Sequence, residues 1–221
     1  MATEHHDTKT ALILAAGELF AEHGFDGTSV RAIADKAGAN VAAVNYHFGS
    51  KQDLYVATLR HVVRGATGTP IRAFLESPST VCTPEAMRAV IRETALSTFS
   101  KLSSPDRPQW RFRLLLRVMF ESPSGALDPV IDETFRPDVA DLMALARRAR
   151  PDLPERELLL WAFSFMGQVS FYMFVREPVL RVLDRRAYDR EFLEEAADHV
   201  ADVMVAALDL PGCGRAAERL P

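Results

Sequence analysis

The chain contains 221 residues, of which 48% are hydrophobic and 25% are charged. This balance predicts a globular protein with a buried core and excludes a disordered or collagen-like chain. Acidic residues outnumber basic ones by 30 to 26, so the formal net charge is -4. The chain therefore lacks the strongly basic character that is typical of proteins that bind nucleic acid.

No apolar run reaches the roughly 18 residues of a membrane span, and the start of the chain lacks the pattern of a secretory signal. We therefore expect a cytoplasmic protein that has no membrane partner. Cys82 and Cys213 lack the spacing of metal ligands and are too few for a framework of several disulfides. The sequence accordingly predicts no metal site and no cofactor.

Apolar residues recur at intervals of three and four, while proline and glycine cluster between the apolar segments. This pattern predicts an all-α protein. A Gly- and Thr-containing stretch near residue 65 separates short helices from a longer, more aromatic region. We expect a compact domain at 1–64, a linker at 65–83, a larger helical domain at 84–210 and a flexible tail at 211–221.

Three helices are predicted in the first domain. The first begins after Asp7 or Thr8 and ends at Gly24, and the second follows an N-cap at Thr28 and stops before residue 38. The third is capped by Asn40 and covers residues 41–48. Two short helices joined by a tight glycine turn and packed on a longer one form a helix-turn-helix.

The third helix has an unusual free surface. At about 100° per residue, Val41, Val44 and Phe48 fall within one arc and are expected to face the first two helices. The opposite side carries Ala42, Ala43, Tyr46 and His47, whereas a solvated helix normally carries Glu, Lys and Gln. Small methyl groups beside neutral donors suit insertion into the major groove of DNA. Asn45, at the edge of the buried arc, is a weaker candidate for a DNA contact.

The fourth helix, residues 51–64, begins with a Ser50–Asp53 capping pattern. Lys51 lies in its first turn, where the helix dipole disfavours a cation. A bound phosphate would reverse that effect, because free N–H groups and a lysine together attract an anion. The start of the second helix at Thr28 predicts a similar contact with another phosphate. A solvated lysine without a role is the alternative for Lys51.

Residues 28–34, 37–38 and 44–54 together resemble the DNA-binding signature of the TetR family of transcriptional regulators. The resemblance covers about the first quarter of the chain. It implies that the DNA contacts come from Thr28, Arg31, Asn40, Val41, Ala42, Tyr46, His47 and Lys51. The sequence departs from the pattern at 41–43, where Val-Ala-Ala has little capacity to hydrogen-bond to bases.

The proposed reading domain is itself acidic, since residues 1–60 hold five basic side chains against seven acidic ones. DNA contact is therefore expected from helix N-termini, neutral donors and a few placed cations.

The larger domain is predicted to contain a helix opening at Pro84, a central helix at 110–120 and a stretch at 127–150 that Pro137 kinks or divides. Two further helices follow Pro154 and end before residue 211. Residues 117–127 resemble the C-terminal domain of the TetR subgroup that includes the cefoperazone and chloramphenicol sensitivity regulator.

Large or polar side chains on the apolar helices are candidates for an effector pocket. They are Trp110, Arg113, Arg117, Phe120, Trp161, Phe165, Gln168, Phe171 and Tyr172. Taken singly, such aromatic residues more often pack in a hydrophobic core than line a ligand pocket. Arg113 and Arg117 are candidates to bind an anionic group of a ligand, and an internal ion pair with Glu121 or another acid is the alternative. Gln168 either orients a ligand or bonds to a neighbouring backbone group.

The family resemblance also implies that the last two long helices pair with those of a second subunit. Small residues on the first of them would permit close approach. The candidate interface residues are Ser164, Gly167, Phe192, Ala196, Val200, Val203 and Met204.

No enzyme signature is present among the motifs for hydrolases, nucleotide binding or metalloproteases. The sequence therefore predicts a homodimeric repressor that binds a pseudo-palindromic double-stranded operator and is released by a small apolar or aromatic effector. A helical small-molecule carrier whose first domain is merely structural is the alternative.

Overall fold

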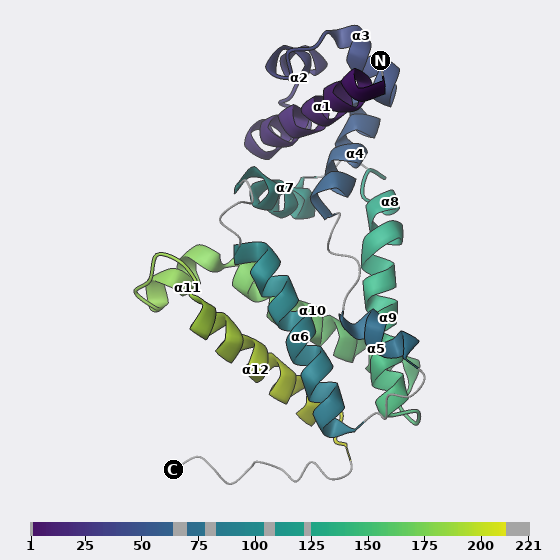
Figure 1. Cartoon of the computed structure of the whole chain (residues 1–221), viewed down its shortest axis with the longest axis vertical. Coiled ribbons are helices and arrows are strands. Elements are labelled where there is room, and N and C mark those ends of the chain that lie inside the picture. The colour runs from purple at the N-terminus through teal and green to yellow at the C-terminus, as the bar shows by residue number, and fades with distance from the viewer. Residues whose placement is uncertain (1, 64–69, 78–82, 104–108, 122–124, 211–221) are drawn as a thin grey trace. The chain divides into compact units, whose positions relative to one another are not determined.

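The computed structural model describes residues 2–63, 70–77, 83–103, 109–121 and 125–210. These residues form helices and turns, with no β-strand among them (Figure 1), which confirms the predicted all-α class. Cys82, Cys213, much of the expected linker and the expected tail at 211–221 lie outside the described residues.

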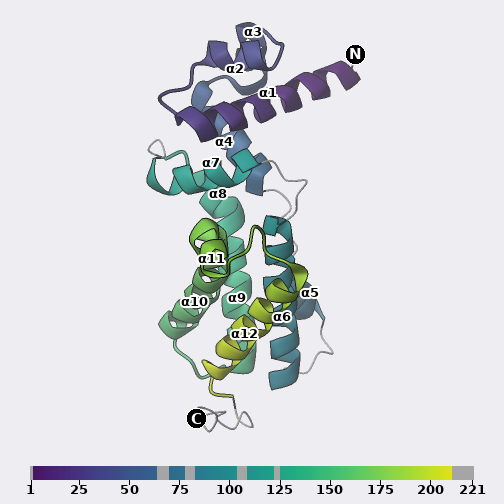
Figure 2. The same ribbon diagram turned by 90° about the vertical axis from the view of Figure 1, so that its left-hand side faces the viewer.

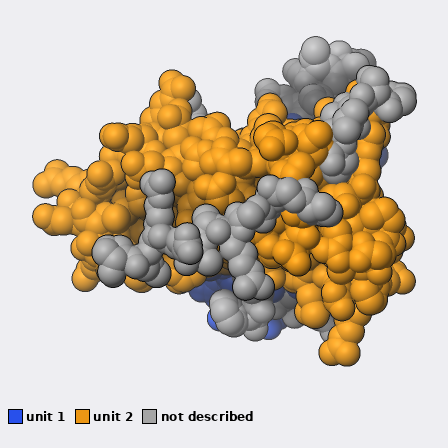
Figure 3. All heavy atoms as spheres, turned by 90° about the horizontal axis from the view of Figure 1, so that it is seen from below, with its two compact units in different colours: residues 1–65, 105–136 blue, residues 66–104, 137–221 orange. Residues whose placement is uncertain are grey.

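The chain forms two compact units, coloured in Figure 3. The first contains residues 1–65 and 105–136, and the second contains residues 66–104 and 137–221. Residues 105–136, which the sequence assigns to the larger domain, therefore pack with the N-terminal helices.

Seven described elements belong to the first unit. They are α1 (Ala2–His23), α2 (Val30–Lys36), α3 (Val41–Phe48), α4 (Lys51–Val63), α7 (Gln109–Phe120), α8 (Asp128–Val130) and the π-helical segment η1 (Ile131–Phe135). Their shared core includes Phe20, Ile33, Val44 and Leu54 together with Trp110 of α7. The core thus joins all the long helices of this unit.

The predicted bounds of α3, the predicted start of α4 and the predicted end of the first helix at Gly24 agree with the structure. Asn40 caps α3 by accepting a hydrogen bond from the Ala43 N–H at 2.8 Å, and Ser50 does the same for α4 from Asp53 at 3.0 Å. However, α1 begins at Ala2, earlier than expected. The N-cap of α2 is Ser29, not Thr28.

Helix α7 packs on α1 rather than at the centre of the larger domain, where the sequence placed it. The Trp110 ring occupies the space that a side chain at position 17 would need, and Gly17 supplies that space. Arg111 contacts His61 of α4 at 2.6 Å. Both contacts attach α7 to the N-terminal helices.

The second unit contains the remaining described helices, α5 (Pro70–Glu76), α6 (Pro84–Ser103), α9 (Arg136–Ala149), α10 (Glu155–Phe174), α11 (Arg176–Val182) and α12 (Arg190–Ala206). Helices α6, α10 and α12 pack against one another, as Figure 2 shows. Thr83 caps α6, as the sequence predicts from the following proline. Helix α5 lies inside the expected linker and buries Ile71.

Ion pairs join α6 to α12 in this unit. Arg88 binds both Asp198 and Asp202, and Arg92 binds Asp198 at 3.0 Å. These bonds lower the pKa of Asp198, chiefly through the hydrogen bond from Arg92.

Candidate nucleic-acid interface

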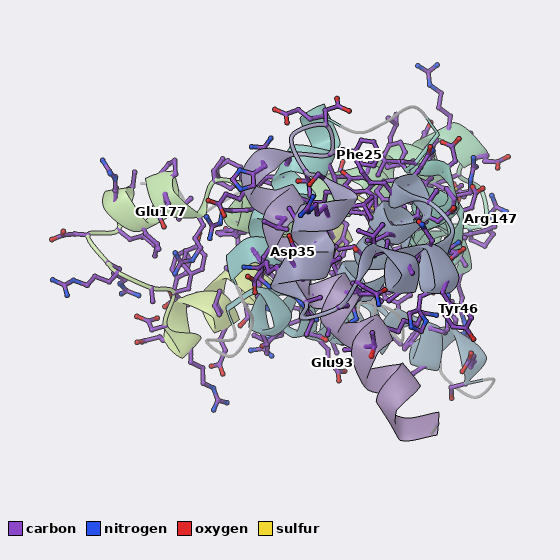
Figure 4. All side chains as sticks on the ribbon, turned by 90° about the horizontal axis from the view of Figure 1, so that it is seen from above. Phe25, Asp35, Tyr46, Glu93, Arg147 and Glu177 are labelled. Carbon is purple, nitrogen blue, oxygen red and sulfur yellow. The ribbon has the colours of Figure 1, made fainter. Side chains whose placement is uncertain are left out.

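The exposed side of α3 forms the candidate interface. Tyr46 is 76% exposed and Val41 is 42% exposed, while Val44 is completely buried against the other helices. Figure 4 looks onto this end of the first unit and labels Tyr46 on α3 and Asp35 on α2. Val44 is therefore buried and Tyr46 exposed, as the sequence predicts. By contrast, Val41, which was expected in the buried arc, is exposed, and Ala43, which was expected to point away, packs against the core.

Some polar side chains at α3 already make contacts within the helix and its cap. The Asn40 oxygen accepts the capping bond from Ala43, so this residue orients the start of the helix. The rings of Tyr46 and His47 meet edge to face with their centroids 5.1 Å apart. Asn45 and Ala42 are exposed beside them.

Thr28 lies apart from the other predicted contacts because its side chain is buried. Its hydroxyl donates to the Gly24 carbonyl at 2.8 Å, and its backbone N–H bonds to Phe25. A phosphate needs a donor, and both donors of Thr28 are used within the fold. Ser29, which the sequence analysis missed, is the exposed residue at the start of α2.

Lys51 lies over an aromatic ring at the start of α4. Its Nζ is 4.3 Å from the centroid of Phe25, and Phe25 packs edge to face on the buried Tyr55 at 5.2 Å. Cation–π contacts hold such a charge without neutralising it. The lysine is therefore positioned by the core while its charge stays available to an anion.

The other cations of the first unit have different surroundings. Lys36 binds Glu18 at 2.8 Å, and this hydrogen bond raises the pKa of Lys36. Arg31 is highly exposed and lies 4.0 Å from Asp35. Lys9 lies 5.8 Å from the Phe48 ring, which places a further cation beside α3 that the sequence analysis missed. No sequence signal identifies it, because the α1–α3 contact is not local.

The candidate pocket residues are divided between the two units. On α7, Trp110 is buried against α1, Arg113 is exposed, and Arg117 binds Glu121 at 2.6 Å. The ion pair predicted as the alternative for Arg117 is therefore confirmed. The side chain of Phe120 lies outside the described residues.

The α10 members of the pocket set lie in the second unit. Trp161 donates to the Met204 carbonyl at 2.9 Å, and Gln168 lies 3.1 Å from the Met204 sulfur, so both bond to neighbouring groups. Phe165 is part of the core, whereas Phe171 is 55% exposed. Tyr172 packs within an aromatic group whose other members are Phe99, Phe171, Tyr188 and Phe192.

The predicted dimer residues also divide into two sets. Ala196, Val200 and Met204 are buried in the core of the second unit, and Phe192 packs against it. The chain itself covers these side chains, so they are not available to a second subunit. Ser164 and Gly167 of α10 are exposed, as is Val203 of α12.

Among the described residues, no group of His, Cys, Asp and Glu is arranged to hold a metal ion. Within the same residues, no single helix combines the length and apolar character of a membrane span, although the pair Glu155–Tyr172 and Arg176–Val182, bent by 67°, meets both criteria together.

A reading helix with an exposed neutral face, held in a helix-turn-helix beside placed cations, defines a DNA-binding transcriptional regulator. Residues 12–58 match the bacterial regulatory proteins of the tetR family, and residues 84–208 match the C-terminal domain of the HTH-type transcriptional dual regulator CecR. The chain belongs to the TetR family and carries a C-terminal domain of the CecR type.

Individual relatives agree with this assignment. The dual regulator CecR of Shigella flexneri is 29% identical over 88% of both chains. The regulator RutR of Escherichia coli K12 is 38% identical over 31% of this chain and 32% of its own.

Solved structures share the fold. NalD of Pseudomonas aeruginosa, described as the secondary repressor of the MexAB-OprM multidrug efflux pump, has a TM-score of 0.58 at 21% identity, covering 96% of this chain and all of its own. The TetR-family regulator PfmR of Thermus thermophilus has a TM-score of 0.56 at 20% identity, covering 88% of this chain and 93% of its own.

Proposed function

We propose that this regulator is a homodimeric repressor that reads a pseudo-palindromic operator through α3 and is released by a small effector. The observation that carries the proposal is the exposed face of α3, where Tyr46 extends from a helix fixed by the buried Val44. Direct readout would come from Arg31, Val41, Ala42, Asn45 and His47 near the groove, with Tyr46 and Lys51 on phosphates.

Dimerisation is supported by an apolar stripe on α10. Leu160, Phe163, Gly167 and Phe171 recur at helical spacing on one side, and the three large side chains among them are each at least 44% exposed. Exposed apolar surface of this kind marks interfaces. The stripe includes Gly167 and lies beside Ser164, both from the predicted set, and small residues there allow two helices to approach closely.

An apolar or aromatic effector is supported by the second unit. Its aromatic group of Phe99, Tyr172, Tyr188 and Phe192 joins the packed helices α6, α10 and α12 through edge and stacked contacts. Rings of this kind bind aromatic ligands through offset and edge contacts. No catalytic step is part of the proposal.

The experiment is a binding titration of the full chain on a duplex from upstream of its own coding region, against an unrelated duplex. We expect specific binding, and Tyr46→Ala should weaken it by about tenfold or more, since one hydrogen bond to a charged group contributes about 1.5–3 kcal/mol. Val182→Ala is the matched control because Val182 is 86% exposed on α11.

Candidate aromatic compounds added to the complex test the effector. Release of the duplex would support the proposal. Binding of such compounds with no duplex binding under any condition would instead identify a small-molecule carrier.

A further inference from the structure

A continuous helical stretch carries the chain from the first unit into the second. Helix α8, η1 and α9 follow one another without a break from residue 128 to 149, and the boundary of the units falls after Arg136. The other two crossings, near residues 65 and 104, are not fully described. Every residue of this helical connection between the two units is described.

The stretch changes its winding just before the boundary. The Arg136 N–H bonds to the Ile131 carbonyl five residues earlier, which is the π-helical pattern. Pro137 explains it: proline has no N–H to donate to the Glu133 carbonyl, and its ring would clash with that carbonyl in an α-helix. A wider turn relieves the clash and places a less regular segment at the boundary.

Glu133 in this π-turn is bound to α4. The Arg60 Nε donates to Glu133 Oε2 at 2.8 Å, and an Arg60 terminal amine donates to the other carboxylate oxygen. This two-point geometry is the strongest and most directional form of a side-chain ion pair. Arg60 lies in the last turn of α4, the helix that begins at Lys51.

The ion pair therefore links the last turn of α4 to the segment that precedes the boundary of the units. One end of α4 carries the Lys51 cation beside the candidate interface, and the other end is tied to the helix that continues into the second unit. Helix α4 also packs directly on α1 and α3. Because a helix is stiff over this length, tilting its last turn tilts the surface that faces DNA.

We propose that Glu133 is a positioning residue that acts through Arg60 to fix α4 to the crossing helix, so that a movement of α9 reaches the DNA-reading helices through this pair. The inference rests on the proposed function. The core of the first unit holds α1–α4 together without it, since Phe20, Leu54 and Tyr55 are almost fully buried. The pair is therefore expected to affect orientation more than folding.

Operator titrations of the full chain test the proposal, with the upstream duplex and an unrelated duplex as probes. Arg60→Gln and Glu133→Gln should each weaken specific binding by about five- to tenfold, because an exposed pair contributes little and a dimer contains two. The swapped double variant R60E/E133R should regain most of the lost affinity. Binding to the unrelated duplex should change little.

Whether Glu133→Gln raises or lowers the affinity for DNA distinguishes a positioning role from an effect of net charge alone. Removing an acid strengthens binding to DNA if only net charge matters, whereas the proposal predicts weakening. Asp132→Asn is the matched control, because Asp132 binds Arg136 at 2.6 Å within the same stretch. It removes the same charge without touching the Arg60–Glu133 pair.

Hydrogen exchange gives a second measurement on the same proteins. Amides in the last turns of α4 should exchange faster in Glu133→Gln than in the wild type or Asp132→Asn. The proposal is overturned if the wild type binds its operator and Glu133→Gln binds as tightly, or if Asp132→Asn weakens binding equally. Absence of wild-type binding to any duplex would instead refute the proposed function.

Discussion

Single residues matter at this interface because the reading unit carries few available cations. Lys36 is bound to Glu18 and Arg60 to Glu133, whereas Lys51 lies over the Phe25 ring and keeps its charge exposed to an anion. Although residues 1–60 are acidic overall, aromatic rings position two of their cations, Lys9 over Phe48 and Lys51 over Phe25.

Lys51→Ala should weaken binding to all duplexes alike and flatten its salt dependence. Each lost phosphate contact reduces the slope of log K against log salt by about 0.9, so a dimer loses about two units of slope. Lys36→Ala is the control, because Glu18 already neutralises that charge. A slope that is equal in the Lys51 variant and the wild type would remove Lys51 from the phosphate contacts.

Gly17→Ala should destabilise the protein although alanine favours helix. A methyl group there would overlap the Trp110 ring, and overpacking typically costs about 1–3 kcal/mol, more than the roughly 1 kcal/mol gained in helix propensity. Urea denaturation measures the change. In a Trp110→Leu background Gly17→Ala should cost less than in the wild type, whereas strictly additive effects of the two substitutions would show that the ring does not fill the Gly17 space.

At the scale of elements, local signals predict the helices that face DNA. Asn40 and Ser50 each cap a helix as expected, and glycine at position 49, with φ of 81°, ends α3. These contacts span three or four residues and can be read from the sequence. By contrast, Trp110 and Gly17 are in contact but far apart in the sequence. No local pattern therefore predicts that α7 packs on α1.

The predicted dimer residues illustrate a second limit of prediction from sequence. The apolar spacing of Ala196, Val200 and Met204 on α12 correctly predicts that these side chains are buried. An amphipathic pattern does not show whether the same chain or a second subunit covers them. The seven-residue helices α5 and α11 were not predicted from the sequence. Length alone is not the reason, since α2 is equally short; α11 differs from α2 in having no side-chain cap at its start.

Acid should loosen the attachment of α6 to α12. The folded-state pKa of Asp198 lies below its ordinary value because Arg92 and Arg88 bind it. This contribution to stability is therefore complete above about pH 4 and is lost as the pH falls through the folded pKa. Urea denaturation at a series of acidic pH values should show a flatter decline for Asp198→Asn than for the wild type; parallel declines would contradict this role for the network.

For the whole molecule, the proposed pairing of subunits through α10 would turn one reading helix into two. Gly167→Arg should leave the subunit folded, since nothing lies within 4 Å of a side chain built there. In a dimer it would place a charge against the partner's apolar stripe, which costs several kcal/mol if the charge is buried unpaired. Sedimentation should then report a monomer, with Val182→Arg still dimeric. A dimeric Gly167→Arg protein would place the interface elsewhere.

A hydroxyl-radical footprint of the full chain on its upstream duplex tests the central claim most directly. Two reading helices related by a two-fold axis predict two protected segments whose centres lie about 34–36 Å apart, or one helical turn, around a pseudo-palindrome. Tyr46→Ala should remove both together. A single protected segment, or protection that survives in Tyr46→Ala, would contradict a dimer that reads DNA through α3.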